Sequence, residues 1–515
     1  MKIRAARLVE EAGRVARLLR ERGIEPGDRV AVLGPNRPEW VRWALATWLA
    51  GAVLVPIPHP VRITDRSAFG ELVGSLFRAA GCRMVIVAPN VAGVVPEGQA
   101  LPWDSPLPRR TLDRDHEGGP GELAVIQFTS GSTASPKGAA LTHAAVVSAI
   151  FGLADAVGLL PGEDRLASWL PYFHDYGLFC YLLMPLLTGT DLLTLPTELF
   201  AQTPARWFQM LTHGRATMTG GPPSTWAVAL RATERSAEPV DLSSTRMAYM
   251  AAEPIDPVLV DRLVTSAPQM GLDPRALGAG YGLAEATLTV TRTPSGRGIR
   301  IEAVDLSALS RGRAEPATGG TMKRVVSCGP PIGDIQCRIV GAAGPLPDRR
   351  VGEIEVRGST IMSGYVGADA PDPFRDGWLR TGDLGYLAEG ELYVTGRIKD
   401  VIIVLGQNYS PEDIEWAAAR VPGVRPGRSV AFPRPGTEDE IVVVVEPRAE
   451  SEPEGLEGRV RAAVMAAVGL IPREVVVLPR GSIPKTTSGK LQRAAARDAY
   501  GRLRSANEAG PGVGS

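Results

Sequence analysis

Two glycine-rich segments of the chain carry the residue types that bind phosphate groups. Residues 128–138 follow a strand predicted at 123–127 and read Phe-Thr-Ser-Gly-Ser-Thr-Ala-Ser-Pro-Lys-Gly. Small residues let backbone N–H groups approach a phosphate, while hydroxyls and Lys137 add hydrogen bonds and positive charge. Pro136 stands where a Walker A loop needs glycine, which excludes that motif. A flexible linker is the alternative, although a strand-to-loop placement with a Pro-Lys-Gly ending is unlike a linker.

The second segment, residues 277–287, reads Leu-Gly-Ala-Gly-Tyr-Gly-Leu-Ala-Glu-Ala-Thr. It is not a dinucleotide-binding fingerprint, because its glycines are spaced GxGxG and Leu283 follows them. Glu285 comes just after this turn, and a carboxylate there suits a hard cation such as Mg²⁺ that bridges phosphates. Taken alone, a solvated glutamate at the start of a helix is the commoner explanation.

His174 and Asp175 are adjacent within an aromatic stretch, residues 169–177. A histidine beside an aspartate invites a catalytic interpretation, but no GxSxG nucleophile elbow exists to complete a triad. A histidine that lines a pocket and a satisfied core histidine therefore both remain open.

Three charged residues of the C-terminal part also suit a nucleotide. Asp383 carries a short carboxylate that can accept two hydrogen bonds from a ribose diol, and Arg397 can form a forked contact with a phosphate. Residues 481–493 form a loop rich in glycine, serine and threonine that presents Lys490. Singly, each of these is an exposed charge in a turn, which is usually only solvated.

The periodicity around these segments predicts an α/β protein. Apolar spacing predicts a helix at 5–22, and Pro38 opens another that bears Trp40 and Trp43 on one face, most simply as core packing. Strands alternate with helices through the first 200 residues, which indicates parallel sheets covered on both faces. Strand-rich segments follow residue 320, then a compact α+β stretch to about 500. The predicted strands are 28–34, 52–56, 84–88, 336–340, 352–357 and 391–395.

The composition excludes several classes of protein. The 515 residues contain 56 Lys and Arg against 56 Asp and Glu, so no net charge favours nucleic acid or an anionic membrane. Four scattered cysteines suit neither a disulfide framework nor a zinc site. The longest apolar run, residues 178–187, is too short to span a bilayer, and no signal peptide is visible. We expect a cytoplasmic protein without membrane insertion.

Together and in this order, the segments resemble the adenylate-forming superfamily of acyl-CoA ligases, luciferases and peptide-synthetase adenylation domains. The resemblance spans about residues 5–493. Within the superfamily, the sequences of residues 169–178, 281–288 and 326–329 resemble those of the fatty acyl-AMP ligases. It implies a large N-terminal domain of parallel-rich sheets flanked by helices, with a distorted β-barrel subdomain. A small, mobile α+β C-terminal domain would follow it.

The resemblance also implies domain boundaries. An adenylation domain would span 1–396, a hinge 397–400 and a lid domain 401–500, while 501–515 lack periodicity and are expected to form a disordered tail. The interval from Glu285 to Gly329 is 44 positions, longer than in typical CoA-ligase relatives. The extra segment, about 295–323, is thought in fatty acyl-AMP ligases to restrain the domain movement that admits CoA. A surface loop that merely tolerates length is the alternative.

Carried over by position, the resemblance implies the following roles. Lys490 would neutralise charge at the α-phosphate, Glu285 would bind Mg²⁺, and His174 would line the acyl entrance. Asp383 would hold the ribose hydroxyls with Arg397 nearby, and Lys399 would be the hinge residue. The ATP phosphates would contact Thr129, Ser130, Gly131, Ser132, Thr133 and Lys137. The adenine would lie beside Ala252, Glu253, Tyr281 and Gly282.

The function that the resemblance implies is ATP- and Mg²⁺-dependent activation of a fatty acid to its acyl-adenylate with release of pyrophosphate. The acyl group would pass to the phosphopantetheine thiol of an acyl carrier protein in a polyketide or nonribosomal peptide pathway. Ile403 stands where luciferase-like relatives carry a second lysine that favours the thiol-transfer conformation. An acyl- or aryl-CoA synthetase and a non-catalytic nucleotide-binding protein are the alternatives.

Overall fold

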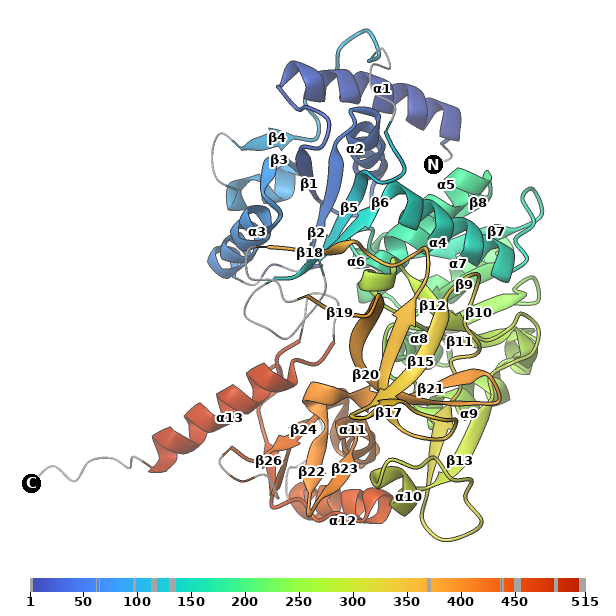
Figure 1. Cartoon of the computed structure of the whole chain (residues 1–515), viewed down its shortest axis with the longest axis vertical. Coiled ribbons are helices and arrows are strands. Elements are labelled where there is room, and N and C mark those ends of the chain that lie inside the picture. The colour runs from blue at the N-terminus through green and yellow to red at the C-terminus, as the bar shows by residue number, and fades with distance from the viewer. Residues whose placement is uncertain are drawn as a thin grey trace, which may run out of the picture. The chain divides into compact units, whose positions relative to one another are not determined.

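The computed structural model divides the chain into two compact units whose elements are labelled in Figure 1. Unit 1 comprises Met1–Ile299, Cys328–Cys337 and Val356–Leu379; unit 2 comprises Arg300–Ser327, Arg338–Glu355 and Arg380–Ser515. The predicted boundary at 396 falls inside unit 2. The structure describes residues 3–61, 63, 65–95, 99–112, 118–128, 136–367, 372–435, 437, 440–448, 455–485 and 490–508.

The first sheet of unit 1 has the order β18-β6-β5-β2-β1-β3-β4. Its five strands β1 to β5 run parallel, whereas β6 and β18 are antiparallel to their neighbours. The strands are β1 (Arg29–Leu33), β2 (Val53–Ile57), β3 (Cys82–Val87), β4 (Ala100–Pro102), β5 (Leu123–Phe128), β6 (Gly138–Thr142) and β18 (Gly364–Val366). The helices are α1 (Ala5–Glu21), α2 (Pro38–Leu49) and α3 (Arg66–Ala80). Trp40 and Trp43 are fully buried, which confirms their predicted packing role.

The second sheet of unit 1 has the order β12-β11-β10-β9-β7-β8, and only the β11–β12 pair is antiparallel. Its strands are β7 (Arg165–Ser168), β8 (Asp191–Thr194), β9 (Met218–Gly221), β10 (Met247–Met250), β11 (Leu277–Gly282) and β12 (Thr289–Arg292). The helices are α4 (His143–Ala156), the π-helix η2 (Tyr176–Leu183), α5 (Met184–Thr188), α6 (Thr197–Gln202), α7 (Arg206–Gly214), α8 (Pro223–Thr233) and α9 (Pro257–Ser266). The α/β class with parallel-rich sheets is therefore confirmed.

The strand-rich part that the sequence predicts beyond residue 320 is present. A hairpin of β13 (Ile301–Asp305) and β14 (Met322–Val326) encloses the short helix α10 (Leu306–Ser310). A further sheet has the order β16-β15-β17-β20-β19, with β21 paired to β20. Its strands are β15 (Gln336–Gly341), β16 (Gly344–Pro345), β17 (Gly352–Arg357), β19 (Phe374–Arg375), β20 (Trp378–Ala388) and β21 (Glu391–Arg397).

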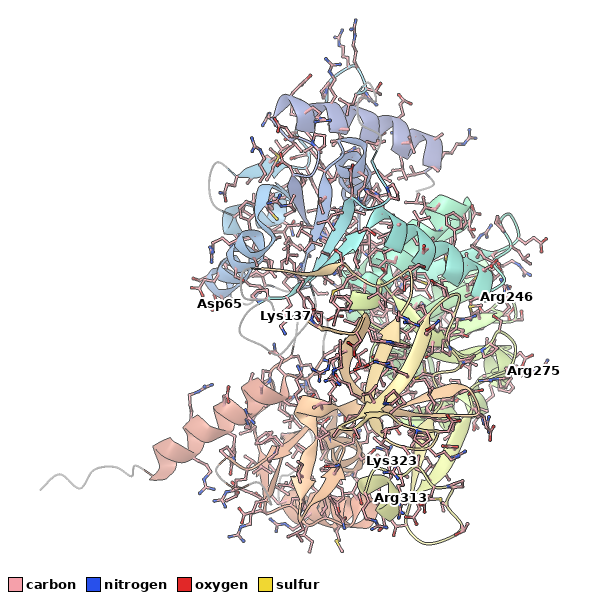
Figure 2. The ribbon with its side chains drawn as sticks, in the orientation of Figure 1. Asp65, Lys137, Arg246, Arg275, Arg313 and Lys323 are labelled. Carbon is pink, nitrogen blue, oxygen red and sulfur yellow. The ribbon has the colours of Figure 1, made fainter. Side chains whose placement is uncertain are left out.

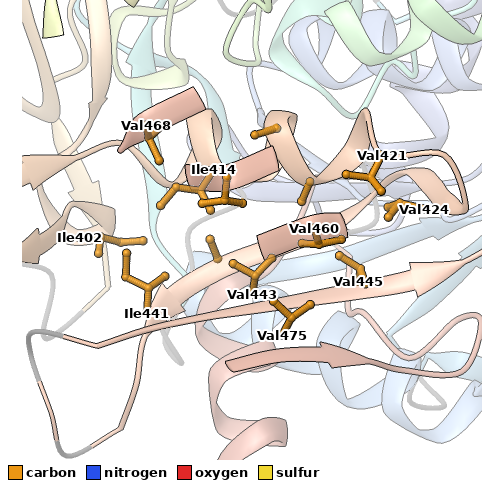
Figure 3. Close-up of a cluster of buried hydrophobic side chains, with 14 of the residues drawn as sticks. Ile402, Ile414, Val421, Val424, Ile441, Val443, Val445, Val460, Val468 and Val475 are labelled. Carbon is orange, nitrogen blue, oxygen red and sulfur yellow. The ribbon is translucent and has the colours of Figure 1, made fainter. Parts of the chain in front are cut away.

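The C-terminal segment of unit 2 is built around a three-stranded sheet, β24-β25-β26. Val443 and Val445 of the central strand pack on one face against Ile414 and Val460 of two helices (Figure 3). Both faces of this strand are covered, which explains its uninterrupted run of valines. The elements are β22 (Ile402–Val404), β23 (Gln407–Tyr409), α11 (Pro411–Ala419), β24 (Val424–Pro433), β25 (Ile441–Pro447), α12 (Leu456–Val468), β26 (Glu474–Val477) and α13 (Arg493–Glu508).

The C-terminal helix corrects one expectation. Residues 501–508, predicted to belong to a disordered tail, lie in α13, and 509–515 fall outside the described residues. Ala496 and Tyr500, one turn apart, are buried, and the Tyr500 ring packs 5.7 Å from that of Phe432. This anchor and the alanine- and arginine-rich composition favour continuation of the helix past Gly501.

The four cysteines are free thiols; Cys82, Cys180 and Cys328 are buried, and Cys337 is partly buried. Within the described ranges, no helix is long and apolar enough to cross a membrane.

Candidate active site

The carboxyl ends of parallel strands of unit 1 carry the four residues that are predicted to lie beside adenine, Ala252, Glu253, Tyr281 and Gly282. Strands β9, β10 and β11 end side by side, and ligands of open α/β sheets bind outside such ends. Ala252 follows β10 with φ of 71°, a left-handed conformation that is uncommon for alanine. Glu253 accepts a hydrogen bond of 3.1 Å from the Ser224 N–H at the start of α8. Backbone strain at this edge is typical of a functional turn.

Gly282, predicted to contact adenine, has a packing role in the structure. It pairs with Thr289 across β11 and β12, and a Cβ atom at Gly282 would overlap the carbonyl oxygen of Leu288. The hairpin that carries Tyr281 can therefore close only with glycine at this position.

We expect Gly282→Ala to lower the free energy of unfolding by about 3 kcal/mol, because the methyl group forces the two strands apart. Chemical denaturation followed by circular dichroism measures this. Gly152→Ala, in helix α4 with open space around the position, is the matched control and is expected to be neutral or stabilising. Equal stability of the two variants would contradict the close approach.

Glu285 is held by two groups of one distant segment, residues 362–365. The Tyr365 hydroxyl donates to Glu285 Oε1 at 2.6 Å, and the Met362 N–H donates to the Glu285 carbonyl at 2.8 Å. Lys137 Nζ lies 5.5 Å from the centroid of the Tyr365 ring (Figure 2). Strand β18 produces this convergence because it pairs Tyr365 with Ala139, two residues beyond Lys137.

The turn after Glu285 contains a buried residue in an uncommon backbone conformation. Thr287 is fully buried with φ of 63°, and its hydroxyl donates to the Thr360 carbonyl at 2.7 Å. A β-branched residue in this conformation is strained, and the buried hydrogen bond offsets part of the cost. Glu285 and Lys137 thus both contact Tyr365, the carboxylate through its hydroxyl and the ammonium over its ring.

The predicted phosphate loop lies largely outside the described residues. Thr129, Ser130, Gly131, Ser132 and Thr133 belong to this part, and only Lys137 of the set is described. The loop joins β5 to β6, whose residues Phe128 and Gly138 are register partners.

The loop that carries His174 is anchored to the first sheet of unit 1. Asn36 donates to the Leu170 carbonyl at 2.6 Å and accepts from the Tyr172 N–H, while Gln127 donates to the Phe173 carbonyl at 2.9 Å. His174 Nδ1 lies 2.5 Å from Asp175 Oδ1, and the histidine side chain is 22% exposed. It is therefore a partly accessible, oriented imidazole rather than an enclosed core residue.

A buried polar cluster that the sequence analysis missed lies on one face of the second sheet. Arg292, only 3% exposed, donates from Nη2 to the Tyr249 hydroxyl at 2.6 Å, and its guanidinium lies 4.6 Å from that ring. Burial lowers the pKa of Arg292 and raises the pKa of Tyr249 to about 12. A Cβ at Gly220 would overlap the hydroxyls of Tyr176 and Tyr181, so these phenols fill the space above β9.

Asp383 and Arg397 of unit 2 form a direct ion pair. They face each other across β20 and β21, and Arg397 Nε lies 2.8 Å from Asp383 Oδ1. The aspartate side chain is 7% exposed and the arginine 51%. A buried carboxylate thus lies beneath an accessible guanidinium at the end of β21.

The two predicted lysines also belong to unit 2. Lys399 lies in the short 3₁₀ turn η6 (Ile398–Asp400) between β21 and β22. Lys490 directly precedes the bridge between Leu491 and Lys485, where the segment turns into α13. His174, Tyr281 and Glu285, in contrast, belong to unit 1.

A magnesium ion would have few protein ligands here. No group of three or more histidine, cysteine, aspartate or glutamate side chains able to hold a metal occurs among the described residues. The single carboxylate of Glu285 fits Mg²⁺, which usually binds one or two carboxylates and completes its shell with substrate phosphates and water.

Comparisons with known proteins agree with this geometry. Residues 5–366 match the AMP-binding enzyme family. A putative ligase of Mycobacterium tuberculosis is 36% identical over 94% of this chain and 92% of its own. The medium-chain-fatty-acid–[acyl-carrier-protein] ligase JamA of Moorena producens is 32% identical over 95% of this chain and 88% of its own. A solved structure from a study of fatty acyl-adenylate ligases of E. coli and L. pneumophila has a TM-score of 0.86 and 31% identity. The match covers 98% of this chain and 92% of that one.

The chain therefore belongs to the AMP-binding enzymes, and within this adenylate-forming superfamily to the fatty acyl-AMP ligases. It is an adenylate-forming ligase, which confirms the class that its motifs predict.

Proposed function

We propose that the protein uses ATP and Mg²⁺ to activate a fatty acid as its acyl-adenylate, and passes the acyl group to the phosphopantetheine thiol of an acyl carrier protein. The convergence of Lys137, Glu285 and Tyr365 is the observation that carries the first step. The names of similar ligases, which specify a fatty acid and an acyl carrier protein, support this substrate and this acceptor. A polyketide or nonribosomal peptide pathway would use such a product.

The charges of the residues explain the first step. The oxygen of the acid forms a bond to the α-phosphorus, and the bond from that phosphorus to pyrophosphate breaks. Two anions repel each other, so the site must supply positive charge where the pentacoordinate phosphorus develops. Lys490 would stabilise that charge, Lys137 would bind phosphate oxygens, and Asp383 would orient the ribose through its hydroxyls. Bound at Glu285, Mg²⁺ would supply further positive charge to the phosphates.

A pyrophosphate-exchange assay with a panel of acids tests the first step. The panel should contain carboxylic acids of increasing chain length. Acid-dependent exchange supports the proposal. Its absence with every carboxylate would leave the non-catalytic nucleotide-binding alternative, and rapid acyl-CoA formation would favour the CoA-synthetase alternative.

The segment 295–323 supports transfer to a carrier protein rather than to CoA. Lys323 Nζ lies 2.6 Å from Asp413 Oδ2 of α11, with side chains 12% and 18% exposed, and α10 packs against β23. The segment is thus bound to the C-terminal part of unit 2, where it would restrain rotation about the hinge. Ile403, half-exposed on β22, would offer no charge to favour the thiol-transfer conformation.

We expect Lys323→Met to raise acyl-CoA formation about fivefold without changing adenylation, because loss of a partly buried ion pair weakens the restraint by about 1 kcal/mol. Thioester yields with CoA and with a loaded carrier protein measure the ratio. Arg313→Met, which removes an exposed ion pair with Glu315 in the same segment, is the control (Figure 2). An unchanged ratio in Lys323→Met would refute the restraint.

A further inference from the structure

A buried ionic cluster in unit 2 joins three elements through one arginine. Arg493, the first residue of α13, forms a fork with Glu415 of α11, with 2.7 Å from Nε to Oε1 and 2.7 Å from Nη2 to Oε2. Nη2 also lies 2.8 Å from Glu412 Oε1. Nη1 lies 3.1 Å from Asp400 Oδ2, in the turn η6 between β21 and β22. The arginine side chain is 18% exposed and the two glutamates less than 10%.

The contact with Asp400 is not needed to pack α13 against α11. Glu415 alone binds Nε and Nη2, which form one edge of the guanidinium, and a forked pair of this kind already fixes the planar group. The remaining nitrogen, Nη1, binds Asp400, which is the last residue of the predicted hinge and precedes the C-terminal strands and helices. Arg493 also stands three positions after Lys490, so the same guanidinium anchors the segment that carries the lysine.

We infer that Arg493 is a positioning residue that binds Asp400 rigidly to the C-terminal part, so that hinge rotation takes place at 397–399 and carries Lys490 as part of one body. With Asp400 held by Arg493 and Arg493 held by Glu412 and Glu415, the end of the hinge cannot move independently of α11 and α13. The position of Lys490 is then set by the hinge angle rather than by freedom of its own loop. The inference rests on the proposed adenylation, in which Lys490 acts on the α-phosphate.

Asp400→Asn tests the link most selectively, because it leaves the fork between Arg493 and Glu415 intact. We expect kcat for pyrophosphate exchange to fall about tenfold with KM for ATP within twofold of wild type, since positioning acts on the transition state. In Arg493→Met, kcat should fall further, by about 100-fold. Arg493→Lys should recover part of this loss, because an ammonium can replace one contact of the guanidinium but not the fork.

A double-mutant cycle separates positioning from stability. If Arg493 acts on the hinge through Asp400, Arg493→Met combined with Asp400→Asn should be no slower than Arg493→Met alone. Independent, multiplying effects would overturn the inference. Arg338→Met is the matched control, because Arg338 of β15 pairs at 2.6 Å with the fully buried Glu355 of β17 in the same unit, and neither residue belongs to the hinge. It should lower the melting temperature comparably while kcat stays unchanged.

The outcomes distinguish the two proposals. Absence of exchange in the wild-type protein with any acid would refute the proposed function. An active wild type with an Asp400→Asn variant of unchanged kcat would leave that function standing and refute the role of Arg493.

Discussion

Replacing Lys490 with alanine is expected to slow acyl-adenylate formation by about 10³-fold, while ATP binding stays nearly intact. The ammonium of Lys490 would interact most strongly with the negative charge that the carboxylate and the α-phosphate share in the transition state. A group that acts there lowers kcat rather than ground-state affinity. Single-turnover adenylation and ATP titration by calorimetry measure the two quantities separately.

The control for this change lies in the same segment. Lys485, bridged through its backbone to Leu491, should tolerate alanine with only a few-fold loss of rate. If ATP affinity and rate fell by the same factor in Lys490→Ala, the lysine would bind the ground state and the transition state equally. That result would contradict the assigned role.

The second large effect concerns Glu285. We expect Glu285→Gln to lower the rate of exchange by at least about 10²-fold and to raise the Mg²⁺ concentration needed for half-maximal rate, because a neutral amide is a poorer ligand for a hard cation. The substitution keeps the shape of the side chain and an oxygen that can accept from Tyr365. Exchange rates measured across a magnesium titration test both expectations.

Tyr365→Phe provides the graded comparison. It removes the 2.6 Å hydrogen bond to Glu285 but leaves the carboxylate and the aromatic ring near Lys137 in place. A hydrogen bond to a charged group contributes about 1.5 kcal/mol, so the rate should fall about tenfold. If Glu285→Gln needed no more Mg²⁺ than the wild-type protein, Glu285 would not be the ligand of the metal.

Local patterns predicted the elements of this fold closely. Helix α1 was expected at 5–22 and lies at Ala5–Glu21; the strands expected at 28–34 and 84–88 lie at Arg29–Leu33 and Cys82–Val87. Periodicity and glycine or proline at the ends act within a few residues, so they can be read from the chain directly. The tail was the exception, because α13 is held past Gly501 by the contact of Tyr500 with Phe432.

The order and the residue types of the motifs were enough to predict the superfamily and the candidate site residues. This is because the chemistry of a site depends first on which functional groups are present. The motifs placed Asp383 and Arg397 near each other at a ribose, whereas their direct ion pair across β20 and β21 comes from strand register. Only the tertiary structure decided that Tyr365 binds Glu285, that the backbone at Gly282 leaves no room for a Cβ atom, and that Arg493 reaches Asp400. These contacts join residues far apart in the chain, and they depend on strand register and on which faces are buried together. No local pattern encodes register, since a shift of one residue would leave the periodicity unchanged while moving every side chain to the other face.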